Sequence, residues 1–281
     1  MGVLRTRMEQ DLVVRGRSPR TREAYLHAVA ALAHYYRRPP DQLTAREVQQ
    51  YLLHLIQERH LAWSSCRVAV AGLRFFYEIT LGRARAAFTV PLPKGAQKLP
   101  EILSREEVAR LLASVATLKH RVLLMTTYAG GFRVGEVVRL RGTDIDAERM
   151  LIRVEQGKGR KDRYTLLSRR LLEELRHYER VYQPTPWLFP QRHRPAPMDP
   201  SSALRIYHAA KARAGIRKQG GIHALRHAFA THLLESGTDI VTIQSLLGHG
   251  SIKTTLRYVH LSRHRVAEHV SPLDQLPLEP A

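Results

Sequence analysis

The sequence predicts a mainly α-helical protein with a small antiparallel β-sheet, divided into two domains by a linker. Apolar residues recur at helical spacing in several stretches on both sides of a basic, proline-rich segment, residues 87–101. Two runs of β-like composition flank the tripeptide Gly157-Lys158-Gly159, which is typical of a hairpin. The chain has 281 residues, of which 44% are apolar, so it is long enough to form two hydrophobic cores.

Residues 1–86 are expected to form a bundle of three helices. The first begins after Ser18, a capping residue that precedes a proline in the first turn. The second begins at a capping box from Thr44 to Glu47, in which the two side chains bond each other's backbone amides. The third extends from about residue 64 to residue 81 and ends at Gly82, since glycine readily closes a helix.

Residues 102–262 are expected to form the second domain, which begins with another capping box, Ser104 to Glu107. A helix over 122–128 is followed by the pair Gly130-Gly131, and Arg133 then lies at the start of a short helix. The remaining expected elements are strands over 150–156 and 162–167, a loop over 183–200, helices over 201–214, 224–236 and 239–247, a last helix through Tyr258, and a C-terminal tail over 263–281.

The charge composition indicates a polyanionic partner. Lys and Arg total 45 against 25 Asp and Glu, which gives a formal net charge of +20. Most of these cations are arginine, whose planar guanidinium binds phosphate oxygens in pairs, although a purely solubilising charge is the alternative. Both domains are basic, so both are expected to contact double-stranded DNA. The candidate DNA contacts are Arg20, Arg22, Arg67, Arg74, Lys94, Lys98, Arg160 and Arg163.

Cysteine usage and hydropathy indicate a cytoplasmic protein. Cys66 is the only cysteine, so it can form neither an internal disulfide nor a cysteine zinc cluster, which favours a reducing compartment. No apolar run approaches the ~18 residues that span a bilayer, and no signal-peptide core is evident at the start. We therefore expect no association with a membrane.

The segment 223–233 places polar residues on a face apart from its apolar stripe. His223 and Arg226 are three residues apart and therefore share one face of the predicted helix. His223 and His227, at positions i and i+4, offer a metal site as an alternative, but the segment lacks the carboxylate of HExxH sites. A structural histidine is a further alternative. We expect neither a metal nor another cofactor.

Two further segments place single polar residues at turns. Gly248 and Ser251 are expected to end one helix and start the next, which turns the chain at His249 and precedes Tyr258. Arg133 is expected at a helix N-terminus, where backbone amides and the helix dipole favour an anion. Taken singly, Tyr258 is as well explained as an ordinary buried tyrosine, and Arg133 as an ordinary surface arginine. Only their combination indicates a phosphate site.

This combination, in this order and spacing, resembles the tyrosine recombinase (phage integrase) family over roughly residues 8–262, with a layout similar to Xer-type and integron-type enzymes. The resemblance implies an N-terminal helical, SAM-like core-binding domain and a C-terminal α+β catalytic domain that together clamp DNA. Phe132 and Gly135 replace the Leu and Ser that are usual beside the first arginine. The catalytic set that the resemblance implies is Arg133, Lys158, His223, Arg226, His249 and Tyr258, with Glu136 and Lys161 in support.

The family resemblance also implies a reaction and an assembly. Tyr258 would attack a DNA phosphate to form a 3′-phosphotyrosine, and Lys158, or else nearby Lys161, would protonate the leaving oxygen, without metal or ATP. The protein would be a monomer or weak dimer off DNA and a tetramer on it, with the tail 263–281 exchanged between subunits and accessory proteins as further partners. Integration, excision, dimer resolution and transposition all remain open as its role. The alternatives are a type IB topoisomerase and a non-catalytic DNA-binding relative.

Overall fold

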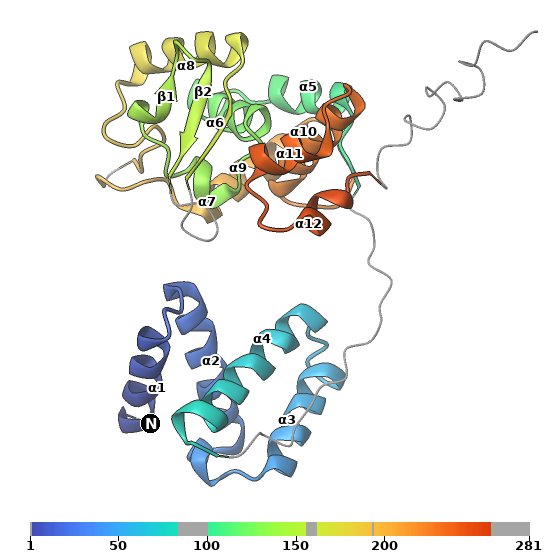
Figure 1. Cartoon of the computed structure of the whole chain (residues 1–281). Helices are drawn as coiled ribbons and strands as arrows, with labels where there is room; N and C mark the ends of the chain where they lie inside the picture. Colours follow the sequence, from blue (N-terminus) through green and yellow to red (C-terminus); the bar gives the residue numbers. More distant parts are fainter. Residues whose placement is uncertain (1, 84–100, 156–161, 193, 260–281) are drawn as a thin grey trace, which may run out of the picture. The chain divides into compact units, whose positions relative to one another are not determined.

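The computed structural model describes residues 2–83, 101–155, 162–192 and 194–259. The chain forms two compact units, which divide between Gln97 and Lys98. Figure 1 labels the helices and strands of both units. Residues 87–100 of the predicted linker and the predicted tail, 263–281, lie outside the described residues, so the predicted domain boundaries stay predictions.

Residues 2–83 contain four α-helices instead of the predicted three (Figure 1). The sequence pattern does not predict the additional helix, α1, because its apolar residues are hardly segregated to one face, although Met8 and Leu12 are buried. The bounds are α1 Gly2–Val14, α2 Pro19–Tyr36, α3 Ala45–Gln57 and α4 Trp63–Arg74, with a 3-10 turn, Pro40–Gln42, before α3 and a π-helical turn, Phe75–Thr80, after α4.

Both predicted helix caps of this unit are confirmed. The hydroxyl of Ser18 accepts a hydrogen bond from the amide of Thr21 at 3.2 Å. The hydroxyl of Thr44 accepts one from the amide of Glu47 at 3.3 Å, and the Glu47 carboxylate accepts one from the Thr44 amide at 2.8 Å. These bonds satisfy backbone donors that a helix start otherwise leaves unpaired.

The N-terminal unit has a hydrophobic core of its own. Helices α2 and α4 cross closely because Gly72 has no side chain, and a Cβ there would lie only 3.0 Å from the Tyr25 Cα. The side chains that fill this core come from all four helices and include Met8, Leu12, Val29, Leu32, Val48, Leu52, Leu73 and Phe76. A hydrophobic core of its own is typical of a domain that folds independently.

The second unit is an α+β domain, as predicted. Its described helices are α5 Arg105–Ala113, α6 Leu118–Ala129, α7 Val134–Val137, α8 Arg169–Tyr182, α9 Pro200–Arg213, α10 His223–Glu235, α11 Ile240–Leu247 and α12 Ile252–Leu256, and a 3-10 turn covers Gly142–Asp144. Its strands are β1 Ile145–Asp146, β2 Leu151–Val154 and β3 Arg163–Leu166. The sequence analysis does not predict α8 or β1. Half of the residues of α8 are charged, but its buried stripe, Leu171, Leu175 and Tyr178, has clear helical spacing that the sequence analysis overlooks.

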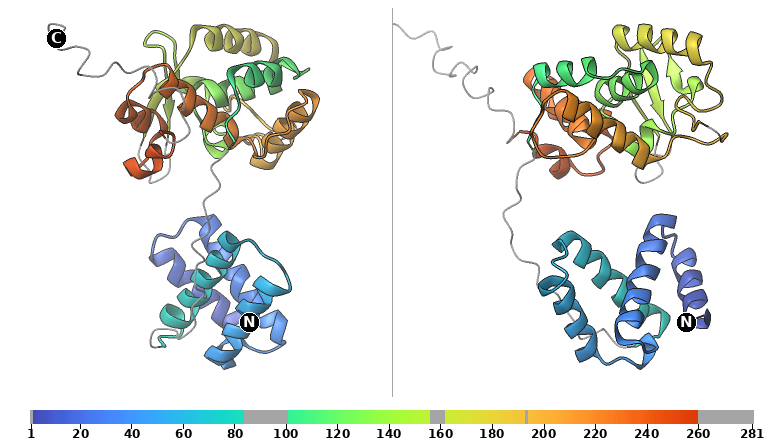
Figure 2. Two further views of the ribbon diagram at one scale, coloured as in Figure 1. Left: turned by 90° about the vertical axis from the view of Figure 1, so that its right-hand side faces the viewer. Right: turned by 180° about the vertical axis from the view of Figure 1, so that it is seen from behind.

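The three strands form an antiparallel sheet in chain order. Leu151 pairs with Leu166 and Val154 with Arg163, which confirms the predicted pairing of β2 with β3. Residues 156–161, at the predicted hairpin tip, lie outside the described residues. In both views of Figure 2, α10 to α12 gather on one side of the unit and α8 lies on the other.

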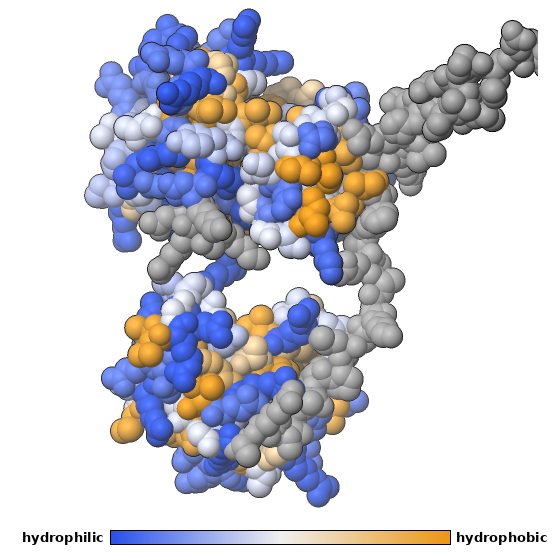
Figure 3. Space-filling model, in the orientation of Figure 1, coloured by the Kyte–Doolittle hydropathy of each residue, from blue (hydrophilic) through white to orange (hydrophobic). Residues whose placement is uncertain are grey.

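Apolar side chains gather on the surface over α11 and α12 (Figure 3). Val241, Leu256 and Val259 are the large apolar residues exposed in this region, and Val241 is 65% exposed. Clustered apolar surface of this kind is typical of contact with another protein segment. Within the described parts of the chain, no helix is long and apolar enough to cross a membrane.

Removing the α3 cap should destabilise the N-terminal unit. We expect Thr44→Ala to lower its free energy of unfolding by about 1 kcal/mol, because the Glu47 amide loses its acceptor. Urea unfolding of the full-length protein measures this loss. Ser64→Ala is the matched control, since it removes a hydroxyl from the first turn of α4, where no side chain caps the helix. Equal losses in the two variants would show that the capping box contributes nothing.

Candidate active site

Five of the predicted catalytic residues lie in the described part of the second unit. Arg133 is the N-cap of α7, and His223 and Arg226 belong to the first turn of α10. His249 follows α11, and Tyr258 follows α12. The predicted helix through Tyr258 is wrong at its end, because α12 stops at Leu256 and the tyrosine lies in the turn beyond it. The hairpin residues Lys158, Arg160 and Lys161 lie outside the described residues.

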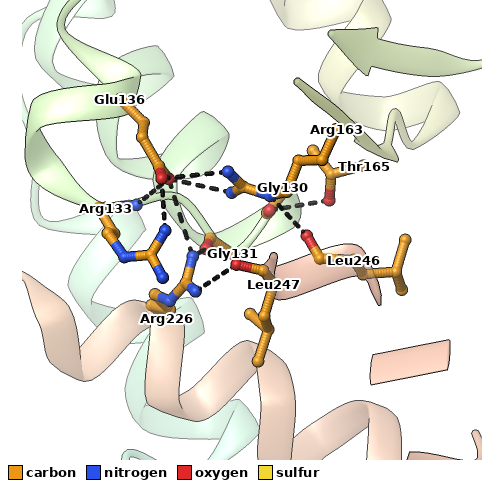
Figure 4. A network of polar contacts seen from close by, with 9 residues as sticks. All are labelled: Gly130, Gly131, Arg133, Glu136, Arg163, Thr165, Arg226, Leu246 and Leu247. Carbon is orange, nitrogen blue, oxygen red and sulfur yellow. Dashed lines mark hydrogen bonds and ion pairs between the residues drawn. The ribbon is translucent and has the colours of Figure 1, made fainter. Parts of the chain in front are cut away.

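The carboxylate of Glu136 lies at the centre of three guanidiniums (Figure 4). Arg133 donates to it from its side chain at 2.6 Å and from its backbone amide at 2.8 Å. Arg163 donates to both oxygens, at 3.0 and 2.9 Å, and Arg226 lies 3.7 Å away. The hydrogen bonds and charges of these arginines outweigh burial, so the pKa of Glu136 is lowered. One carboxylate faces three cations, and the excess positive charge favours an anion.

Arg226 is fixed by backbone carbonyls as well as by this carboxylate. It is only 4% exposed and donates to the carbonyl oxygens of Gly131 at 2.5 Å and Leu247 at 2.6 Å. Gly131 adopts a positive φ of 60°, and a Cβ there would lie 2.3 Å from the ring of Phe229. Glycine is therefore required where the chain brings its carbonyl to the guanidinium. Burial and neighbouring Arg133 lower the pKa of Arg226, and the carbonyls and Glu136 hold its charge in place.

Arg163, a predicted DNA contact, is bonded inside the protein instead. Its side chain is 8% exposed, and its Nε donates to the Leu246 carbonyl at 2.9 Å while its other nitrogens bond Glu136. Gly248 lies against it, since a Cβ there would approach the Arg163 Cδ to 2.7 Å. Arg163 therefore connects β3 to α7 and to the end of α11. This placement favours a supporting role over contact with DNA.

Tyr258 is buried, at 2% exposure, in a small apolar cluster with Phe229, Ile243 and Leu247. Its hydroxyl lies 3.0 Å from Nδ1 of His227, a residue that the sequence analysis considers only as a metal ligand or a structural histidine. The imidazole one position after Arg226 is the sequence signal for this contact, but the apolar spacing of α10 gives no indication of it.

The ring of His249 is nearly parallel to that of Tyr258, with centroids 6.4 Å apart. Nδ1 of His249 lies 2.9 Å from the hydroxyl of Thr255. His249 is therefore held beside the tyrosine ring and not at its hydroxyl. His223, at the exposed start of α10, has its pKa lowered by desolvation and by Arg226 and Arg133, which indicates that these groups lie close together.

The buried position sets the protonation states of the tyrosine and its neighbours. Desolvation raises the pKa of Tyr258, and this effect exceeds the opposing influence of Arg226 and the other nearby arginines. Desolvation and adjacent positive charge lower the pKa of His227 and of His249 to about 4. At neutral pH both imidazoles are uncharged and the phenol keeps its proton. A reaction at the Tyr258 oxygen therefore requires a proton acceptor.

The predicted DNA contacts of the N-terminal unit differ in exposure. Arg20 and Arg67 are exposed, whereas Arg22 and Arg74 are partly buried. Lys94 and Lys98 lie outside the described residues. Across residues 2–83, 101–155, 162–192 and 194–259, no three His, Cys, Asp or Glu side chains are grouped as metal ligands, and the alternative pair His223 and His227 has no third member there.

Comparison with known proteins assigns the chain to a family. Residues 101–265 match the phage integrase family, and residues 4–86 match the phage integrase N-terminal SAM-like domain. The chain belongs to the phage integrase family of tyrosine recombinases. Site-specific DNA recombination is the activity that this membership supports.

Two relatives illustrate the similarity over the whole chain. The protein y4qK of Sinorhizobium fredii is 44% identical over 278 residues, which cover 99% of this chain and 90% of y4qK. Tyrosine recombinase XerA of Thermococcus onnurineus is 34% identical over 259 residues, which cover 90% of this chain and 89% of XerA. The family fold therefore extends through both units.

Solved structures with the same fold include complexes with DNA. A lambda integrase tetramer bound to a Holliday junction matches with a TM-score of 0.73 at 19% identity, covering 95% of this chain and 78% of that one. XerA recombinase matches with a TM-score of 0.54 at 28% identity, covering 92% of both chains. The lambda integrase match supports the fold alone, since its identity is low.

Breaking the Arg163 connection should destabilise the catalytic unit. Arg163→Met leaves the buried Glu136 with fewer partners, and we expect a loss of about 3 kcal/mol in the free energy of unfolding. Arg149→Met is the matched control, because Arg149 is 81% exposed and pairs with Asp146 at 3.7 Å. Exposed pairs of this kind contribute about 0 to 1 kcal/mol. Similar urea midpoints for the two variants would contradict a structural role of Arg163.

Proposed function

We propose that the protein recombines DNA through attack of the Tyr258 hydroxyl on a backbone phosphate, which produces a 3′-phosphotyrosine. The observation that supports this most directly is that the Tyr258 hydroxyl lies 3.0 Å from His227, the residue after Arg226, while Arg226 bonds the carbonyl of Leu247 in the apolar cluster of Tyr258. Arg133 and Arg226 are both anchored by Glu136, and both influence the pKa of Tyr258. A phosphate held by the guanidiniums would meet the phenol in the same site.

The arginines would stabilise the transition state of this attack. Negative charge grows on the non-bridging phosphate oxygens as the tyrosine oxygen approaches, and guanidiniums donate paired hydrogen bonds to such oxygens. Carbonyl groups and Glu136 already hold Arg226, so little reorganisation is needed when charge develops. His223 and His249 would donate further hydrogen bonds. Loss of one such donor typically lowers the rate by ~10² to 10³.

The chemistry would need neither ATP nor a metal ion. The phosphotyrosine ester keeps the energy of the phosphodiester that it replaces, so a second 5′ hydroxyl can displace the tyrosine directly. The arginines would supply the positive charge that metal ions supply in other phosphoryl-transfer enzymes. Lys158, with Lys161 as the alternative, would protonate the departing 5′ oxygen. Both lysines would act from the segment between β2 and β3.

We further propose that the protein works as a tetramer on DNA. Two recombining duplexes have four strands to cut, and each chain supplies one Tyr258. The exposed apolar residues over α11 and α12 support a contact between subunits beside the nucleophile, and the tail 263–281 is the proposed occupant. Exposed Arg20 and Arg67 support binding of the duplex by the N-terminal unit as well. The place of action would be the cytoplasm, with accessory proteins as further partners.

The nucleophile can be tested with nicked suicide DNA. The probe is a set of nicked duplexes that tile the genomic DNA flanking the coding sequence, and a denaturing gel detects the covalent adduct. We expect Tyr258→Phe to abolish the adduct and to keep DNA binding, because only the attacking oxygen is removed. Binding without any adduct from the unaltered protein would favour a non-catalytic relative. Plasmid relaxation without strand exchange would favour a topoisomerase.

Chelation tests the proposed independence from metals. We expect the same rate of adduct formation in EDTA as in magnesium, since the proposed site uses guanidiniums in place of metal ions. The measurement is the time course of adduct formation at saturating protein and constant ionic strength. A rate that EDTA abolishes and magnesium restores would count against this chemistry.

A further inference from the structure

His227 contacts the one atom of Tyr258 that would react. Its Nδ1 lies 3.0 Å from the phenolic oxygen, and the two ring centroids are 5.8 Å apart. His227 follows Arg226 directly on α10, so one helix turn presents both a phosphate-binding guanidinium and the partner of the nucleophile. The contact brings together residues 31 positions apart in the chain and therefore depends on the tertiary fold.

Among the described residues, His227 supplies the ring nitrogen nearest to this hydroxyl. His249 lies beside the tyrosine ring, and its Nδ1 is bonded to Thr255. His223 is one helical turn before His227 on the same face of α10 and is exposed. His223 and His249 are thus placed to bind a phosphate, whereas His227 is placed to take a proton.

We propose that His227 is a catalytic residue that accepts the phenolic proton of Tyr258 during DNA cleavage. This inference rests on the proposed attack by Tyr258. In the step, the Tyr258 O–H bond breaks and its proton moves to Nδ1 of His227, while the phenolic oxygen forms a bond to phosphorus. The bond from phosphorus to the 5′ oxygen breaks, and that oxygen leaves with the electron pair and takes up a proton. Rejoining reverses each transfer, and His227 returns its proton to the tyrosine.

The surroundings of His227 keep its imidazole neutral before DNA binds. The titratable and charged groups that face it are His223 and Arg226 from α10, and Arg257 and Tyr258 from the segment after α12. Desolvation and these positive neighbours lower its pKa to about 4, so the ring is neutral at pH 7. A neutral imidazole that accepts at Nδ1 carries its hydrogen on Nε2.

Binding of DNA would make this imidazole a stronger base. The phosphate brings negative charge next to Arg226 and opposes the positive field that lowers the pKa of His227. The proton affinity of the acceptor therefore rises only when the substrate is in place. The free protein keeps a protonated, unreactive phenol, and the complex acquires a base whose strength is closer to that required at neutral pH.

The test is the pH dependence of adduct formation with the nicked duplex set described above, at saturating full-length protein. His227→Asn is the main variant, because its amide can occupy the position of Nδ1 but cannot accept a proton. We expect its rate at pH 7 to be roughly 10²-fold lower than that of the unaltered protein. The deficit should shrink about tenfold per pH unit above pH 7, because hydroxide then removes the phenolic proton. DNA affinity should not change.

Control variants separate this role from others. His177→Gln removes an exposed histidine of α8 and should leave the rate and its pH dependence unchanged. An equal deficit of His227→Asn at every pH would show a merely structural role, and an unchanged or faster rate would show that His227 is not the base. Either result overturns the proposal. Absence of any adduct from the unaltered protein is a different failure, which overturns the proposed function itself.

A measurement on the unaltered protein covers the case in which His227→Asn does not fold. The ¹⁵N resonances of His227 in the free protein report which ring nitrogen carries hydrogen. Unprotonated Nδ1 at pH 7 supports the proposal, since this nitrogen must accept from Tyr258. A hydrogen on Nδ1 overturns it, because the phenol would then be the acceptor.

Discussion

One buried carboxylate organises the catalytic unit. Glu136 bonds Arg133 and Arg163 and lies 3.7 Å from Arg226, so its position determines where all three guanidiniums lie. In a partly desolvated site, unpaired cations would repel one another strongly, and a single carboxylate reduces this repulsion without cancelling it. The residual positive charge is what distinguishes the site from an ordinary buried ion pair. In the proposed reaction, the DNA phosphate would supply the missing negative charge.

The backbone supports this arrangement at two glycines. Gly131 brings a carbonyl to Arg226, and Gly248 lets the chain pass close to Arg163. Both positions have a positive φ, and both would clash with a side chain. Arg226 and Arg163 are thus held by main-chain carbonyls of Gly131, after α6, and of α11, as well as by Glu136. Guanidiniums fixed in this way lose little entropy when they bind an anion.

Tyr258, the proposed nucleophile, is attached to a different part of the core. Tyr258 lies in the small cluster around Phe229 and Leu247, whereas the main core of the unit lies between the sheet and the other helices. Helix α12, which precedes the tyrosine, has only five residues. A short helix on a small cluster has few buried contacts to hold it, so local rearrangement there costs less than in the main core. The core therefore holds Tyr258 less firmly than it holds the arginines around Glu136.

The sequence by itself determined the fold class, the capping boxes at Thr44 and Ser104, the strand pair around the hairpin and the family. These features follow from local spacing and from motifs that lie close together in the chain. It did not predict α1, whose apolar residues lack a clear face. Helix α8 was also not predicted, although its buried stripe, Leu171, Leu175 and Tyr178, has helical spacing and was detectable.

The tertiary structure alone decided which polar residues meet. The sequence analysis predicts Arg163 as a DNA contact, because the sequence does not show which charged side chains are buried. In the structure, Arg163 pairs with Glu136. The sequence pattern favours a structural or metal-binding role for His227. In the structure, its ring nitrogen contacts the hydroxyl of Tyr258, 31 residues further along the chain. The first contact joins β3 to α7, and the second joins α10 to the turn after α12. Helical periodicity specifies only which face of a helix a side chain occupies, and the partner on that face comes from the fold.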